Sequence, residues 1–272
     1  MTVLETKGSI SVSPTALAKT AFNQVLCGLR HLHSVSLVHA DLKLDNIMVG
    51  AYTDKPAEVG AVLNQEKARR YPPRLSENNA TVCAAVSQPL PVPGLAEAMQ
   101  CDFYLADFGS AQNEKEHTVE EIAHPDLRAP EVFLGGEWDC SADIWTFGCL
   151  LMEYFLQTRL FRMEARPELS LNSAEISILW QMMGVTMESC SEQLASCKKA
   201  GEFFENGRLK GVPTKSGDSV EVILKRYKPE NLSQPGEIEA LAALVKKCLC
   251  LTPKKRATAD ELLQDPWWGT GK

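Results

Sequence analysis

The stretch Leu37 to Met48, LVHADLKLDNIM, places a dense run of polar residues directly after an apolar lead-in. Within it, the carboxylate of Asp41 is followed by the ammonium of Lys43 and the carboxamide of Asn46. Side chains at these spacings converge on one phosphate-sized volume only when the backbone curls into a loop. We therefore interpret this stretch as a catalytic loop.

The segments on either side of the loop predict a helix before it and short strands around it. Apolar residues recur at three- and four-residue steps up to about His33, which is typical of one face of a helix. Ser13 and Pro14 are suited to the cap and the first position of that helix. Residues 36–39 and 47–49 are short strand candidates. The helix would therefore lead directly into the loop.

A second polar motif follows an apolar run much later in the chain. Residues 103–106, FYLA, predict a buried strand, and Asp107, Phe108 and Gly109 come directly after it. A strand that ends in a carboxylate is a common way to present a metal ligand. Glycine next to it permits a sharp turn of the backbone. We expect Asp107 to be a metal ligand and Gly109 to make the turn.

The C-terminal half of the chain is predicted to be helical. Residues 141–157 are apolar nearly all round, which indicates a central buried helix. Thr258 and Glu261 have the spacing of a capping box at the start of the last helix. Two further amphipathic helices are expected at residues 173–183, with Gly184 as the stop signal, and at residues 237–249.

Two segments lack these patterns. Residues 1–12 read as a loose leader, and residues 51–100 are polar and rich in proline, which is typical of an irregular insert. Within the insert, residues 81–86 are a strand candidate. No internal repeat is visible.

Composition limits the classes of protein. The formal net charge of −7 argues against direct nucleic-acid binding and suits basic partners. Nine cysteines without a CxxC pair indicate reduced thiols and a cytoplasmic or nuclear protein, or both. The start of the chain has no signal-peptide pattern. The longest apolar run, residues 144–156, is shorter than the roughly 20 residues of a membrane span, so no membrane association is expected.

The order of the motifs along the chain resembles that of a known protein family. HADLKLDN after a helix, DFG after a strand, APE at residues 129–131 and a buried helix that opens with ADIW occur in this sequence. Residues 14–268 resemble the large, C-terminal lobe of a eukaryotic protein kinase. Within that superfamily, the chain resembles the SR-protein kinases, in particular fungal SR-protein-kinase-like proteins. Three features carry this narrower likeness: a residue other than arginine between His39 and Asp41, a spacer of 107 − 46 = 61 positions from Asn46 to Asp107, and the segment LRAPEVFLGGEWDCSADIWTFGCLLMEYF.

The resemblance implies a fold class and a domain organisation. The fold would be mainly α within the α+β kinase superfamily, a helical lobe with a small β-hairpin region at the catalytic loop. Residues 13–272 would form this C-terminal lobe, with the spacer as an insert at about 51–100. The small, N-terminal lobe is expected to be absent, because the first forty residues contain no glycine-rich loop.

The resemblance also implies roles for single residues. Asp41 would orient the substrate hydroxyl and accept its proton, and Lys43 would contact the γ-phosphate of ATP. Asn46 and Asp107 would hold Mg²⁺ between the phosphates. The residues expected to give structural support are His39, Gly109, Glu131, Asp143 and Arg256. Of these, Glu131 would pair with Arg256 in the interior, and Asp143 would anchor the backbone of the catalytic loop.

Ala40 departs from the usual kinase pattern. Kinases that are switched on by phosphorylation of the activation loop usually have arginine at this position to pair with the phosphate. The loop at residues 110–128 contains only Ser110 and Thr118 as hydroxyl residues. Our hypothesis is a constitutively formed site that needs no phosphate there.

Two functions remain open at this point. The first is a serine/threonine protein kinase that uses ATP and Mg²⁺ on basic, Arg-Ser-rich protein substrates when a small lobe or a partner protein completes it. The second is a catalytically inactive, kinase-like module that binds other proteins. Transfer of phosphate by the purified chain would distinguish the two.

Overall fold

The computed structural model describes residues 14–50, 60, 61, 64, 69–86, 93–167, 171–212, 217–227, 232 and 234–269. The predicted leader, the Ser13 cap and much of the first part of the spacer lie outside these residues. The chain divides into two compact units, one formed by residues 1–12 and 49–102 and the other by residues 13–48 and 103–272. Each unit is described by itself.

The larger unit contains most of the helices. Its longer helices are α1 (Pro14–Ser34), α5 (Ser141–Leu156), α6 (Ala174–Thr186), α9 (Val220–Tyr227) and α10 (Glu237–Cys248). Its short helices are α4 (Pro130–Phe133), α7 (Glu192–Ala195), α8 (Ala200–Phe203) and α11 (Ala259–Leu263). Single 3₁₀ turns lie at η1 (Leu44–Asn46), η2 (Phe108–Ser110), η3 (Pro125–Leu127), η5 (Pro253–Lys255) and η6 (Pro266–Trp268).

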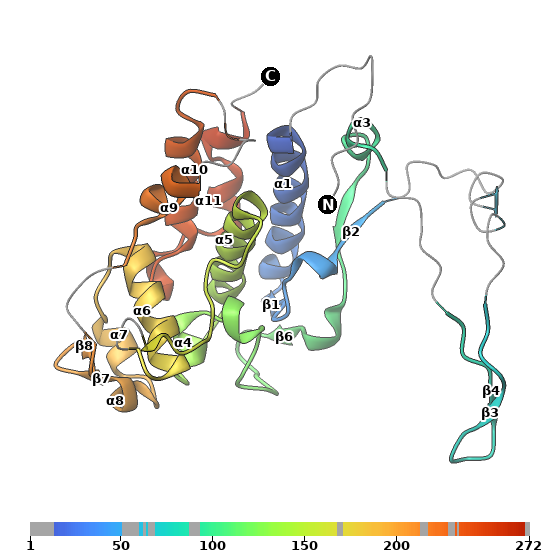
Figure 1. Ribbon diagram of the computed structural model, residues 1–272, viewed down its shortest axis with the longest axis horizontal. Helices are drawn as coiled ribbons and strands as arrows, with labels where there is room; N and C mark the ends of the chain where they lie inside the picture. The colour runs from blue at the N-terminus through green and yellow to red at the C-terminus, as the bar shows by residue number, and fades with distance from the viewer. Residues whose placement is uncertain are drawn as a thin grey trace. The chain divides into compact units, whose positions relative to one another are not determined.

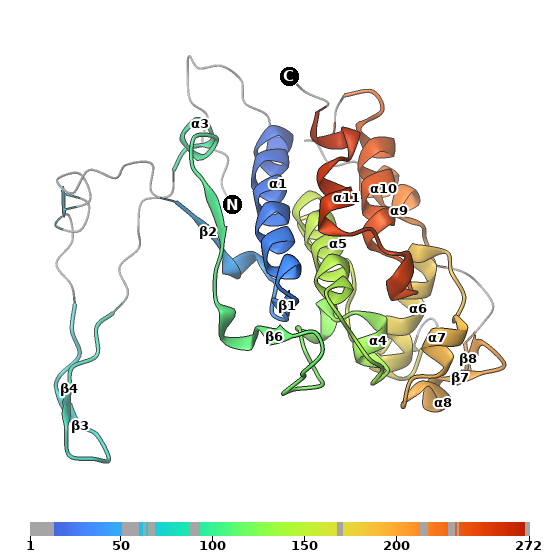
Figure 2. The ribbon, with the colours of Figure 1, turned by 180° about the vertical axis from the view of Figure 1, so that it is seen from behind.

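Helix α5 lies at the centre of this unit. It packs against α10 and α1, and α11 covers another part of α1 (Figures 1 and 2). Most α5 side chains are buried, as the apolar pattern on all sides predicts. A Cβ atom on Gly148 would lie 2.6 Å from the Cβ of Cys248, so the glycine lets α5 and α10 approach closely.

The ends of the helices follow the predicted signals with one correction. The capping box of Thr258 and Glu261 is formed at the start of α11. Gly184 does not end α6, which continues to Thr186. A Cβ on Gly184 would lie 2.5 Å from the Cα of Gly217, so this glycine serves a close approach of two backbones.

The strands correct the prediction of one β-hairpin region at the catalytic loop. Four separate two-stranded sheets are present among the described residues, and the two at the loop pair strands that are far apart in sequence. These are β1 (Leu37–Val38) with β6 (Gln112–Asn113), and β2 (Ile47–Val49) with β5 (Phe103–Leu105). A third pair, β7 (Phe204–Glu205) and β8 (Arg208–Leu209), is a hairpin beyond α8. The sequence could not show these pairings, because strands of two or three residues carry no periodic signal.

The described residues of the smaller unit include the fourth sheet and a short helix. Strand β3 (Arg74–Leu75) pairs antiparallel with β4 (Thr81–Val82). The strand predicted at residues 81–86 is therefore shorter than expected. Helix α3 (Leu95–Ala98) lies near the end of this unit.

Two general expectations can be compared with the structure. None of the described helices combines the length and the apolar character that a bilayer crossing requires. All nine cysteines lie in the described residues and are free thiols.

Candidate active site

The catalytic loop is held by a carboxylate from the central helix. Asp143, in the first turn of α5, is 2% exposed. Its Oδ2 accepts a hydrogen bond from the backbone N–H of His39 at 2.8 Å, and its Oδ1 accepts one from that of Ala40 at 3.0 Å. A buried carboxylate requires such donors, because desolvation without them is costly. The carboxylate of Asp143 thus fixes the backbone from which Asp41 projects.

A histidine from α1 completes the environment of this carboxylate. The Nε2 atom of His33 lies 3.0 Å from Oδ2 of Asp143. His33 is in the last turn of α1, directly before β1. The loop is therefore fixed between α1 and α5. Sequence reasoning missed His33, because only its position near the end of a helix marked it.

His39 connects the catalytic loop to the segment before Asp107. Its Nε2 lies 3.1 Å from the carbonyl oxygen of Ala106, and its Nδ1 accepts the backbone N–H of Asp41 at 3.3 Å. Since a carbonyl oxygen only accepts, Nε2 carries the proton and Nδ1 does not. The ring also packs on Phe108, with 5.3 Å between ring centroids. Both ring nitrogens are occupied, so His39 braces the loop and has no free nitrogen for proton transfer.

Asp41, Lys43 and Asn46 converge as their spacing predicts. The Nζ atom of Lys43 donates to Oδ2 of Asp41 at 2.6 Å. The side-chain amide of Asn46 donates to the backbone carbonyl of Asp41 at 2.9 Å and to its Oδ2 at 3.3 Å. The hydrogen bond to Asp41 raises the pKa of Lys43, and the nearby carboxylate of Asp107 acts in the same direction. Lys43 therefore stays cationic at neutral pH.

Asn46 and Asp107 project from neighbouring backbones. The N–H of Ala106 donates to the carbonyl of Asn46 at 2.9 Å, next to the β2–β5 pair. The amide nitrogen of Asn46 is used on Asp41, which leaves its oxygen available as a ligand. Among the described residues, the carboxylate of Asp107 has no hydrogen-bond or ion-pair partner. These two oxygen donors fit Mg²⁺, which takes few protein ligands and completes its shell with water and phosphate.

The turn after β5 differs from the expectation for Gly109. Asp107 itself has the left-handed conformation, with φ of 64° and ψ of 65°. Left-handed backbone at aspartate is uncommon but tolerated. A Cβ on Gly109 would meet its nearest neighbour, Oδ1 of Asp107, at an ordinary distance of 3.5 Å. The carboxylate residue therefore makes the turn, and neither a positive φ nor a close contact requires glycine at position 109.

A second buried contact ties the APE segment to the end of the chain. The guanidinium of Arg256 forms two hydrogen bonds of 2.7 Å each with the two carboxylate oxygens of Glu131. The two side chains are 0% and 1% exposed. Arg256 also donates to the backbone carbonyls of Cys250 at 2.9 Å and Ser141 at 3.0 Å.

The side chain of Gln112 holds the loop between the DFG and APE segments by hydrogen bonds that sequence reasoning did not find. The side-chain oxygen of Gln112 accepts from the backbone N–H groups of Thr118 at 2.7 Å and Val119 at 2.9 Å. It also accepts from the hydroxyl of Thr118 at 3.0 Å. No motif marks Gln112, because its role depends on a fold of the loop that the sequence does not reveal.

Comparison with known proteins assigns the family. The model of the protein kinase domain matches residues 95–268, which is more than half of the chain. The chain belongs to the protein kinase family. A dual specificity protein kinase of Schizosaccharomyces pombe, lkh1, is 26% identical over 90% of this chain and 31% of its own length. The serine/threonine-protein kinase SRPK of Physarum polycephalum is 24% identical over 93% of this chain and 61% of its own length.

The solved structures show the same fold. The crystal structure of the yeast RNA polymerase II CTD kinase complex CTDK-1 matches with a TM-score of 0.61 and 17% identity, over 97% of this chain and 65% of that chain. This kinase chain thus spans 31% to 61% of the length of the two relatives named above.

These matches correct the expected fold class. A C-terminal lobe with the N-terminal lobe absent was inferred from missing small-lobe motifs. The relatives and the solved structure instead align over 90% to 97% of this chain, and the family model that matches is that of the kinase domain. The chain is therefore assigned to the protein kinase fold, and the restriction to one lobe is withdrawn. The relatives include dual specificity kinases as well as serine/threonine kinases, so the family assignment stops at protein kinase.

Proposed function

We propose that this protein is a serine/threonine kinase that transfers the γ-phosphate of ATP to serine in Arg-Ser-rich proteins. The observation that carries the proposal is the convergence of Lys43 and Asn46 on the carboxylate of Asp41. This arrangement occurs in a chain of the protein kinase family, in which such a loop performs phosphoryl transfer.

The geometry gives each residue a task. Lys43 and Asn46 both bond Oδ2 of Asp41, so its Oδ1 is left to accept the proton of a substrate hydroxyl. Lys43, which its partners keep charged, can balance negative charge on the transferring phosphoryl group. The oxygens of Asn46 and Asp107 would hold Mg²⁺. When bound, the metal ion neutralises the phosphates of ATP.

The charge of the chain and the names of its relatives support the proposed substrate class. The net charge of −7 favours association with basic segments through long-range attraction. One relative is named serine/threonine-protein kinase SRPK, and together with the resemblance of this chain to SR-protein kinases it supports Arg-Ser-rich substrates. Another is named as a dual specificity kinase, so the test must include tyrosine.

A transfer assay with the purified protein tests the proposal. The protein is incubated with radiolabelled ATP, Mg²⁺ and an Arg-Ser repeat peptide, with a matched Arg-Tyr repeat as the second substrate. We expect phosphate on the serine peptide and its loss in Asp41→Asn. Glu202→Gln is the matched control, because this exposed carboxylate of α8 lies outside the catalytic loop and forms no ion pair or side-chain hydrogen bond with other described residues.

Each other outcome contradicts part of the proposal. Equal transfer by the Asp41→Asn variant would remove Asp41 from the mechanism. Preference for the tyrosine peptide would contradict the serine specificity. Binding of the Arg-Ser peptide without transfer would favour the non-catalytic interaction module.

A further inference from the structure

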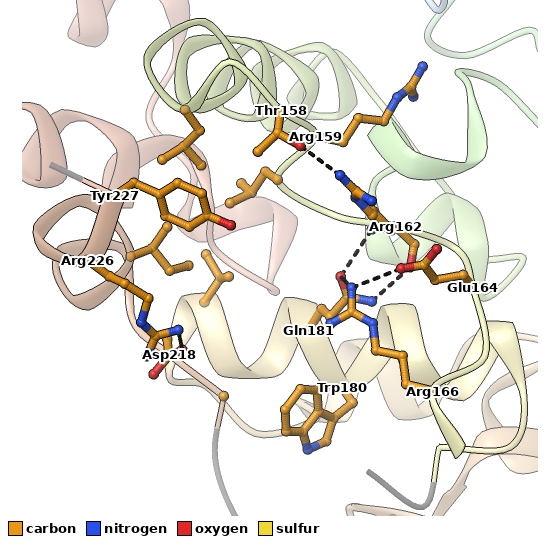
Figure 3. A pocket seen from close by; sticks show the side chains of 15 residues that line it. Thr158, Arg159, Arg162, Glu164, Arg166, Trp180, Gln181, Asp218, Arg226 and Tyr227 are labelled. Carbon is orange, nitrogen blue, oxygen red and sulfur yellow. Dashed lines mark hydrogen bonds and ion pairs between the residues drawn. The ribbon is translucent and has the colours of Figure 1, made fainter. Parts of the chain in front are cut away.

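A cavity lined by arginines lies in the larger unit, away from the residues of the catalytic loop. Its volume is about 520 Å³, and it is bounded by the segment after α5, by α6 and by α9 (Figure 3). We call it the arginine cavity after its four arginines, Arg159, Arg162, Arg166 and Arg226. No residue between His39 and Asn46 lines it.

The arginine cavity carries positive charge in an acidic protein. Four guanidinium groups line it, the carboxylates that line it are Glu164 and Asp218, and Asp126 forms an ion pair with Arg159 at 3.1 Å, which gives 4 − 3 = +1. The whole chain has a net charge of −7. A local charge of opposite sign to the whole protein attracts anions to this place and repels the basic segments proposed as substrates.

A buried glutamine builds the wall of the cavity. Gln181 of α6 is 8% exposed. Its amide nitrogen donates to the carbonyl of Arg162 at 2.8 Å, and its oxygen accepts the backbone N–H of Arg162 at 3.1 Å. The same oxygen accepts from the guanidinium of Arg166 at 3.3 Å. Figure 3 shows both arginines beside Gln181. Gln181 thus fixes the backbone of Arg162 and the guanidinium of Arg166 before any ligand binds, which lowers the entropic cost of binding.

One of the four cations has no carboxylate partner in the described part of the chain. Arg162 donates to the neutral hydroxyl of Thr158 at 2.8 Å. The other three arginines form ion pairs, namely Arg159 with Asp126 at 3.1 Å, Arg166 with Glu164 at 3.5 Å and Arg226 with Asp218 at 2.5 Å. Arg162 is also exposed, so its guanidinium can meet an incoming anion.

We propose that the arginine cavity binds a phosphorylated peptide segment, with the phosphate between Arg162 and Arg166. The planar guanidinium matches phosphate oxygens with two parallel hydrogen bonds, and a phosphomonoester with a charge near −2 is attracted to the net positive charge of the cavity. The rings of Trp180 and Tyr227 also line the cavity and offer apolar surface to the side chains beside the phosphoserine. This binding needs neither ATP nor the catalytic loop.

Fluorescence anisotropy of the whole protein tests the inference. The probe is a short fluorescent peptide with one phosphoserine between neutral residues, measured without ATP. We expect saturable binding that weakens with salt, and about tenfold weaker binding by Arg162→Gln, since this variant loses a charge-assisted hydrogen bond to the phosphate. Arg208→Gln is the matched control, because Arg208 is an exposed arginine of β8 that does not line the cavity.

Further measurements distinguish a phosphopeptide from a carboxylate peptide and from free phosphate. The same peptide with serine should not bind, and the peptide with aspartate should bind at least about tenfold more weakly. Equal binding of the aspartate peptide would overturn the assignment to phosphate. Displacement of the probe by inorganic phosphate at similar concentrations would overturn the assignment to a peptide. Equal binding by Arg162→Gln with unchanged circular dichroism, or no binding of the phosphopeptide, would overturn the site.

Discussion

The buried pair of Glu131 and Arg256 supports a quantitative prediction of stability. Replacing Arg256 by alanine would leave a carboxylate that is 1% exposed without its two guanidinium hydrogen bonds. Removing one partner of a buried pair costs about 3 to 5 kcal/mol. The carbonyls of Cys250 and Ser141 also lose a donor, which places the expected loss in the upper half of this range.

Urea unfolding followed by circular dichroism measures this loss. With a slope of roughly 3 kcal/mol per molar urea for a chain of this size, a loss of about 4 to 5 kcal/mol in Arg256→Ala should lower the midpoint by about 1.3 to 1.7 M. Arg256→Lys should fall between the wild type and Arg256→Ala. Lysine keeps the charge, but it cannot form the two parallel hydrogen bonds.

An exposed pair supplies the matched control. Arg226 and Asp218 are 2.5 Å apart, but their side chains are 60% and 40% exposed. A surface pair contributes at most about 1 kcal/mol, so Arg226→Ala should hardly move the midpoint. Arg256→Ala and Arg226→Ala with equal losses would refute the argument, because burial would then not decide the energy of the pair.

Three further predictions concern other contacts. Asp143→Asn should lower phosphoryl transfer at least about tenfold, measured by kinetics, and destabilise the fold by about 1 to 3 kcal/mol, measured by urea unfolding. The reason is that the single carboxamide oxygen cannot accept both N–H groups of the loop. Burial raises the pKa of Glu153, so folding stability falls as pH rises from its ordinary pKa through the raised one. Glu153→Gln should therefore raise the melting temperature more at pH 7 than at pH 4. Gly184→Ala should cost about 1 to 3 kcal/mol in urea unfolding, because its methyl group would meet the backbone of Gly217.

The long helices were predictable because their patterns are local. Helix α5 is apolar nearly all round, and most of its side chains are buried. The start of α11 follows from Thr258 and Glu261, which satisfy each other's backbone groups within one turn. Such signals need no knowledge of the tertiary structure, so one sequence is enough to read them.

The strand pairs and the turn at Asp107 depend on contacts that no local pattern encodes. Strands β1 and β6 are two residues long and pair across more than seventy positions. Glycine was expected to make the turn after β5, yet Asp107 has the positive φ. The close approach of Gly184 to Gly217 likewise joins distant segments and reads in sequence as a helix stop. Each of these features is fixed by tertiary packing.

The site residues likewise divide into those that a local pattern reveals and those that only tertiary contacts reveal. The convergence of Asp41, Lys43 and Asn46 could be inferred because they lie within six positions. The contact of His39 with Asp143 could not be inferred from the residues alone, because 104 positions separate the two. The resemblance to kinases placed Asp143 at the loop, but it gave no sign of His33.

The backbone of Ala40 bears on how the catalytic loop is regulated. Its φ of 65° is left-handed, a conformation that costs a non-glycine residue roughly 1 to 2 kcal/mol. The N–H of Ala40 donates to Asp143 at 3.0 Å, and its carbonyl accepts from Ala123 at 2.9 Å. These fixed contacts hold the strained backbone while no cation is present at this position to read a phosphate. A loop that packing already holds in place needs no phosphate to form it, which supports our hypothesis of a constitutively formed site.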